Sequence, residues 1–140
     1  MAHLRVSIAD MHFSGQWVDG APETIKAIRS LLPLHSQLIH CRWSGEGCWI
    51  PFGRLILPVG PEHATSHPAP GQFILYPGGI SECEILVAYG AVDFSSKVGQ
   101  LAGNHFATLT TGLEQLPELG RRVLWEGAQP ISIDEDATAR

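Results

Sequence analysis

Short segments in which apolar and polar residues alternate recur along most of this chain. In the first of them, Leu4, Val6 and Ile8 alternate with Arg5 and Ser7, which is the two-residue period of a half-buried β-strand. Further strands are predicted at residues 13–18, 37–44, 48–52, 72–76, 83–89, 105–111, 123–125 and 131–133. We therefore expect a mainly β protein.

An early segment has helical rather than alternating spacing. Ile25, Ile28 and Leu32 form one apolar stripe, as in a helix that packs against a core. Pro22 suits the first helical position, where a missing N–H costs nothing, and Pro33 ends the segment. We expect a helix of roughly eleven residues, close to the average length.

The remaining segments are predicted to be connections and one short late helix. The long connections cover residues 53–70 and 93–103, and loops of this length are often functional. Residues 113–119 have the spacing of a short helix, with Gly120 as its C-cap. Gly15 interrupts the second strand, which indicates a bulge or a close approach of another backbone.

The strand predicted at residues 37–44 has two unlike faces. The face that we expect to point into the core is uniformly apolar and consists of Ile39, Cys41 and Trp43. The face that we expect to point outward consists of Leu38, His40 and Arg42.

Composition narrows the class of protein. With 140 residues, 44% of them hydrophobic, the chain is long enough for one domain with its own core. Its net charge of −5 argues against nucleic-acid binding. No apolar run has the length of a membrane span and no signal peptide is visible, so a cytoplasmic protein is expected. Cys41, Cys48 and Cys83 lack zinc-ligand spacing and are expected to be buried thiols, with Cys48 the most accessible. We expect no metal and no cofactor.

The opening strand–turn–strand–helix, with Ala21-Pro22 and Thr24 at the helix start, resembles cyclophilins. Further segments resemble a bacterial family of uncharacterised cyclophilin-like proteins, and this resemblance covers roughly residues 4–126. The segments that carry it are Arg42-Trp43-Ser44-Gly45, Ala64-Thr65-Ser66, Pro70-Gly71, Tyr76-Pro77-Gly78-Gly79 and Gly103-Asn104-His105-Phe106. The resemblance implies a closed or nearly closed β-barrel, with one early helix and one short late helix. Residues 1–133 would form this domain and residues 134–140 a polar tail. The resemblance implies no established activity.

The chain departs from true cyclophilins at their active face. Their Phe-His-Arg strand corresponds to Ile39-His40-Cys41-Arg42, in which the arginine comes one position late, and their Gln-Gly-Gly-Asp segment is missing. A shift of one residue moves a strand side chain to the opposite face. We therefore expect little or no prolyl isomerase activity.

Arg42, Trp43 and Trp49 are candidate ligand-binding residues. Arginine recognises anions with a fixed fork of donors, and indole rings supply a flat apolar wall. The alternative is a surface arginine that covers a core tryptophan. Asn104, which follows Gly103, is a further candidate for ligand binding.

Glu82, Glu84 and His105 are candidate catalytic residues. Two glutamates spaced two apart in a strand share one face and can do acid–base work. They can equally form a solvated face or pair with Arg42 or Lys97. His105 titrates near neutrality in the absence of perturbation, although a buried histidine is an equal alternative.

Three functional hypotheses follow. The preferred one is a barrel, an enzyme or a binding protein, that takes a small anionic ligand between Arg42 and His105. The second is a peptide- or proline-binding module like a cyclophilin. The third is an oligomeric structural protein, with a homodimer as the simplest case, in which a sheet edge is buried between subunits.

Overall fold

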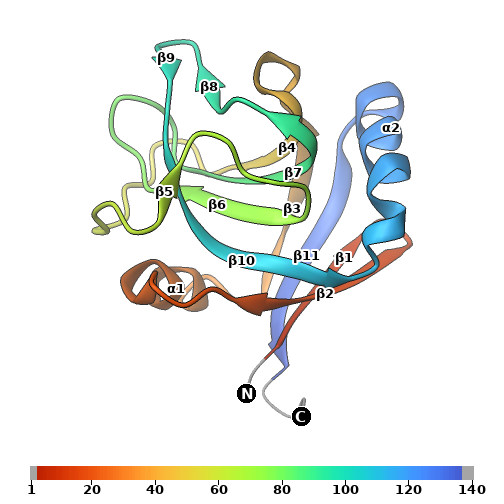
Figure 1. Ribbon diagram of the computed structural model, residues 1–140, viewed down its shortest axis with the longest axis horizontal. Helices are drawn as coiled ribbons and strands as arrows, with labels where there is room; N and C mark the ends of the chain where they lie inside the picture. Colours follow the sequence, from red (N-terminus) through yellow and green to blue (C-terminus); the bar gives the residue numbers. More distant parts are fainter. Residues whose placement is uncertain (1–2, 137–140) are drawn as a thin grey trace.

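The computed structural model describes residues 3–136 and shows an antiparallel sheet that closes into a barrel (Figure 1). The principal strands are β1 (His3–Ile8), β2 (Met11–Trp17), β3 (Leu34–His40), β4 (Gly45–Pro51), β6 (Gln72–Tyr76), β7 (Glu84–Val92), β10 (Gly103–Thr111) and β11 (Gln129–Asp136). These strands follow the order β2-β1-β11-β3-β4-β7-β6-β10, and a β2–β10 pairing closes the ring. The predicted closed β-barrel is therefore confirmed.

The smaller elements decorate this barrel. They are α1 (Pro22–Arg29), the 3-10 helix η1 (Arg42–Ser44), β5 (Ala64–Thr65), β8 (Ser95–Ser96), β9 (Gly99–Gln100), the 3-10 helix η2 (Leu113–Gln115) and α2 (Leu116–Glu126). β5 pairs with the start of β10, and β8 and β9 form a separate hairpin. Among residues 3–136, no helix combines the length and apolar character needed to cross a membrane.

Two apolar clusters lie on opposite sides of the wall formed by β4, β7 and β6. On β7, Ile85 and Val87 belong to the large cluster inside the barrel. Leu86 and Ala88 belong to a second cluster outside it, with Ile74, Cys41, Val92, Phe94 and Leu101. Residues 92–101 thus cover the outer face of this wall, which explains why β7 is an almost continuously apolar strand.

Sequence patterns placed several elements correctly. Leu4, Val6 and Ile8 are buried, and Ile28 packs into the barrel core with Ile25 and Leu32 half-buried beside it. A Cβ atom at Gly15 would lie 2.7 Å from the carbonyl oxygen of Thr108 on β10, which is the predicted close backbone approach. α1 ends at Arg29, earlier than the predicted end near Leu32.

The prediction for residues 37–44 was wrong in its extent and in its faces. β3 ends at His40, and Trp43 lies in η1 with 56% of its surface exposed. Leu38 is buried in the barrel core, whereas Ile39 is exposed. The predicted apolar face of Ile39, Cys41 and Trp43 requires a strand that continues to residue 44. The chain leaves the extended conformation after His40, so these three side chains do not share a strand face.

The strand predicted at residues 123–125 was also wrong, because these residues form the last turns of α2. Pro117 occupies the first turn of this helix, where its missing N–H is tolerated. Gly120 lies inside the helix and is not its C-cap. A Cβ atom there would stand 2.0 Å from a ring carbon of Tyr89, so glycine is needed for the helix to pack on that ring.

The C-terminal segment, the 93–103 connection and the cysteines can also be compared with their predictions. β11 continues to Asp136, within the segment predicted as a tail, and residues 137–140 lie outside the described residues. The connection at residues 93–103 contains the β8–β9 hairpin. The three cysteines are buried and free, as predicted, and the expectation that Cys48 is accessible was wrong because it faces the barrel core.

Candidate functional site

A pocket of about 410 Å³ lies where the outer apolar cluster ends. Its lining residues come from η1, β4, β7, the β8–β9 hairpin and the segment before β7: Trp43, Trp49, Ser81, Glu82, Glu84, Ser96 and Lys97. We call it the tryptophan–carboxylate pocket. It brings together both candidate tryptophans and both candidate glutamates.

The sheet register places Trp49 and Glu84 on the same outer face. Pro51 on β4 stands opposite Glu84 on β7, and Trp49 stands opposite Leu86. Directly opposed residues of antiparallel strands share a face, as do residues two apart along one strand. Trp49 therefore packs against the outer cluster and faces the same space as the Glu84 carboxyl group.

Trp43 and the hairpin are held together at the rim of the pocket. The backbone N–H of Ser95 donates to the Oγ of Ser44 at 2.9 Å, which ties the hairpin to η1. Trp43 projects from η1 and meets Trp49 edge to face, with ring centroids 5.7 Å apart. The hairpin and η1 stand at the same end of the molecule (Figure 1). The two indoles form an apolar wall with a fixed geometry.

Glu84 is the most perturbed carboxyl group of the site. Its side chain is 5% exposed, and within residues 3–136 no hydrogen bond or ion pair reaches its carboxyl group. Burial, followed by the charge on Glu82, raises the pKa of Glu84 to about 8. At neutral pH Glu84 is therefore mostly protonated and can donate as well as accept a hydrogen bond.

The indole nitrogen of Trp49 is a second polar group without a partner. Its Nε1 atom is buried and makes no hydrogen bond within the described part of the chain. A buried donor left unpaired costs about 1–3 kcal/mol. A group that accepts this hydrogen bond would recover that free energy.

Comparison with known proteins identifies the family. Residues 7–134 match a family described as "Protein of unknown function (DUF3830)". The chain belongs to the DUF3830 family. A search of proteins with curated descriptions finds no match for it.

The fold of this DUF3830 chain is similar to that of McbB, solved in a structure described as McbB in complex with tryptophan. The TM-score is 0.73 at 16% sequence identity, over 98% of this chain and 46% of the McbB chain. The chain thus spans less than half the length of McbB. At this identity the likeness shows the fold, and it confirms the cyclophilin-like barrel.

Arg42 and His105 do not line the tryptophan–carboxylate pocket of the DUF3830 chain. Arg42 is exposed on η1, and its charge helps to lower the pKa of His40, after the effect of burial. His105 contacts Thr108 through Nε2 at 2.9 Å and stacks on His63 with centroids 6.1 Å apart. Burial lowers the pKa of His105. The structure records no contact between Arg42 and His105.

Asn104 has a structural environment in the DUF3830 fold. It is buried, and its side-chain amide donates to the hydroxyl of Thr24 and to the carbonyl of Gly60. Its carbonyl accepts from the backbone N–H of Glu62. The Glu62 carboxylate in turn accepts from the backbone N–H groups of Thr24 and Glu23 at the start of α1. Asn104 therefore joins the 53–63 connection to α1.

We expect Asn104→Ala to lower the free energy of unfolding by about 2–3 kcal/mol, because it removes hydrogen bonds from a buried side chain to Thr24, Gly60 and Glu62. Urea denaturation measures the loss. Gln37→Ala, which removes an exposed amide on β3, is the matched control and should change stability by less than about 0.5 kcal/mol. Equal stability of the two variants would contradict a structural role for Asn104.

Several pocket residues were missed as ligand-binding candidates. Ser81, Ser96 and Lys97 complete the lining, yet they lie in connections whose course the sequence pattern does not reveal. The available signal was the cluster of polar residues at positions 81–84 and 95–97, on either side of β7.

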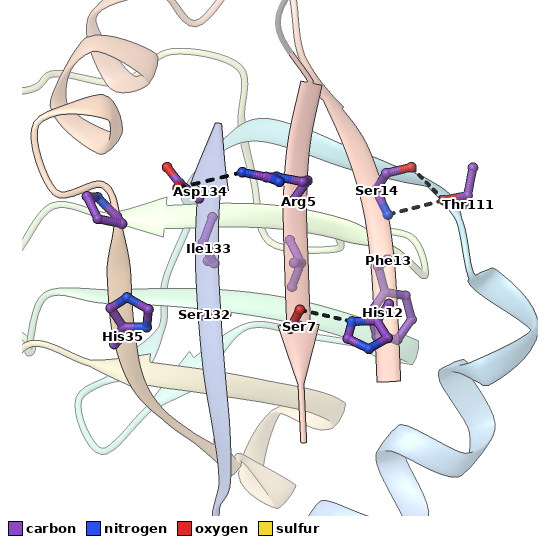
Figure 2. A pocket seen from close by; sticks show the side chains of 12 residues that line it. Arg5, Ser7, His12, Phe13, Ser14, His35, Thr111, Ser132, Ile133 and Asp134 are labelled. Atoms are coloured by element: carbon purple, nitrogen blue, oxygen red, sulfur yellow. Dashed lines mark hydrogen bonds and ion pairs between the residues drawn. The ribbon is translucent and has the colours of Figure 1, made fainter. Parts of the chain in front are cut away.

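A larger cavity, of about 590 Å³, lies on the outer face of β2, β1, β11 and β3 (Figure 2). Most of its polar side chains form pairs with one another. Ser7 hydrogen-bonds His12 at 3.1 Å, Ser14 bonds Thr111, and Arg5 pairs with Asp134 at 3.9 Å. Arg5 and His12 are exposed to solvent. Among the described residues that line it, none has a buried polar atom without a partner, so it is the weaker candidate despite its size.

Proposed function

We propose that this DUF3830 protein binds a small organic molecule in the tryptophan–carboxylate pocket. The observation that carries the proposal is the buried Glu84 residue, whose carboxyl group makes no hydrogen bond or ion pair within residues 3–136, set beside the Trp43–Trp49 wall in one pocket. A carboxyl group shielded from water gains free energy when a ligand supplies its hydrogen-bond partner. The tryptophan bound by McbB is a molecule of this general size class.

The ligand should have an apolar body and a group that hydrogen-bonds a carboxyl group. Trp43 and Trp49 offer an apolar wall, and the Glu84 carboxyl group lies in the same lining. The predicted anionic ligand relied on Arg42, which does not line the pocket, so an anion would depend on Lys97. Glu82 and Glu84 are the candidate acid–base pair of the pocket, with the protonated Glu84 as the proton donor.

A screen of small aromatic and aliphatic fragments tests the proposal, with isothermal titration calorimetry of each hit. We expect Trp43→Ala to weaken binding at least about tenfold, because it removes the exposed half of the indole wall. Trp125→Ala is the matched control, since Trp125 is 77% exposed on α2 and outside the pocket. It should leave affinity unchanged within about twofold.

The larger cavity provides the opposing outcome. If fragments bind but their affinity falls in His12→Ala and not in Trp43→Ala, the binding surface is the outer sheet face shown in Figure 2. That result would overturn the proposal, as would a screen without any hit that depends on Trp43 or Trp49.

A homodimer is a second proposal, favoured by the surface beside the pocket. An adjoining groove is lined by Leu55, Ile56 and Ile80, whose side chains are exposed. Exposed apolar groups that lie together commonly mark an interaction surface. Light scattering after gel filtration would give the oligomeric state, and Ile80→Glu should convert a dimer to a monomer.

The free thiols are compatible with the predicted cytoplasmic location.

A further inference from the structure

The charges of the tryptophan–carboxylate pocket are arranged unevenly with depth. Glu84 is buried at the strand end, whereas Glu82 and Lys97 are exposed at the rim. Solvent screens an exposed charge far more than a buried one. Since Glu84 dominates the protected part of the pocket, the electrostatic preference there is set by a carboxyl group.

The walls add to this preference. A cation beside the face of an indole is attracted by the negative charge of the ring face, and the attraction grows when water is excluded. The same ring repels a carboxylate. Trp43 and Trp49 stand beside Glu82 and Glu84 in one lining, so the indoles and the carboxyl groups favour the same sign of ligand charge.

We infer that the ligand of this pocket is an organic cation, a protonated amine with an apolar body, whose charged group lies beside Glu84 and displaces its proton. The inference rests on the proposed function and names its ligand class. The balance is simple: the amine enters protonated, Glu84 releases one proton to solvent, and an ammonium–carboxylate pair remains. The apolar body lies against Trp43 and Trp49.

The other ionisable groups around Glu84 do not replace it in this role. Glu82 and Lys97 line the pocket, Tyr76 stands opposite Glu84 on β6, and Arg54 lines the adjoining groove. Burial raises the pKa of the neighbouring Cys83 to about 11, and the pKa of Cys41 is raised further. Both thiols therefore stay neutral near pH 7. Among the described residues, no histidine lines the pocket.

Three probes that share one phenyl body and one hydroxyl group test the ligand charge. They are phenylalaninol as the cation, phenylpropanediol as the neutral form and phenyllactate as the anion. We expect phenylalaninol to bind at least about tenfold more tightly than the other two. Glu84→Gln should remove this preference, so that phenylalaninol binds no more tightly than the diol.

The pH dependence of binding tests the proton step. Because phenylalaninol binds the ionised carboxylate, its affinity should rise at least about tenfold from about pH 6 to about pH 8, and this rise should vanish in Glu84→Gln. Calorimetry in two buffers with different ionisation enthalpies should show release of most of one proton near pH 7. The diol should release none.

The outcomes separate the two proposals. Tightest binding by phenyllactate, or equal binding by all three probes, would overturn the cation inference while leaving the pocket's function intact, provided that Trp43→Ala still weakens binding at least about tenfold. No binding by phenylalaninol would also overturn it. If in addition no fragment of the earlier screen depends on Trp43 or Trp49, the proposed function fails as well.

Discussion

Glu84→Gln is expected to make the protein markedly more stable than the wild type at about pH 8.5, and much less so at about pH 4.5. The pKa of Glu84 lies at about 8 in the folded protein, against an ordinary value of 4.5, because the carboxyl group is buried. The folded state therefore keeps a proton that the unfolded state has lost. The contribution of Glu84 to wild-type stability therefore falls as the pH rises from about 4.5 to about 8, and it changes little above about pH 8.

The pH-dependent difference in stability between Glu84→Gln and the wild type should be large. Each pKa unit corresponds to about 1.4 kcal/mol, so the gap between the two proteins should widen by on the order of 4 kcal/mol across this range. Urea denaturation at several pH values measures it. Groups common to both proteins cancel in the comparison, including His40 and His105, whose lowered pKa values make stability rise with pH.

Glu114→Gln provides the matched control, since Glu114 is an exposed carboxyl group outside the pocket. It makes the same substitution at an exposed site and should not widen the gap. A constant difference between Glu84→Gln and the wild type at all pH values would show that Glu84 titrates normally. That result would remove the proton step inferred for ligand binding.

Gly120→Ala is expected to destabilise the protein by at least about 3 kcal/mol, a large effect for one methyl group. The new Cβ atom would overlap the Tyr89 ring, with the nearest ring carbon 2.0 Å away. The ring cannot move freely, because the Tyr89 hydroxyl is hydrogen-bonded to His40 Nε2 at 2.6 Å. α2 would have to shift away from β7, and its buried Leu119 and Val123 would lose contacts with the barrel core.

The comparison variant is Gly60→Ala, where a Cβ atom would meet nothing within 4 Å. It should be neutral or stabilise by less than about 1 kcal/mol, because alanine restricts the unfolded chain. Chemical denaturation of both variants measures the difference. Similar stabilities would show that the Tyr89 ring yields to the new methyl group without cost.

The sequence by itself determined the parts of this protein that depend on local pattern. Alternation identified β1, and the helical stripe of Ile25 and Ile28 identified α1, because burial on one face imposes a period on the chain. The resemblance to cyclophilin-like proteins supplied the closed barrel, which no single strand pattern reveals. The choice of Trp43, Trp49, Glu82 and Glu84 as candidates also came from the sequence.

The tertiary structure decided what depends on contacts between distant segments. Residues 123–125 have a strand-like composition but form helix, because Leu119 and Val123 together complete an apolar face against the barrel. The sequence pattern is compatible with an exposed pair of Glu82 and Glu84. Glu84 is buried because residues 92–101 cover the outer face of β7. The sequence did not exclude a shared site of Arg42 and His105, because alternation along one strand says nothing about the distance between residues of different segments. Burial is a property of the assembled fold, and burial is what distinguishes the Glu84 carboxyl group from the others in this chain.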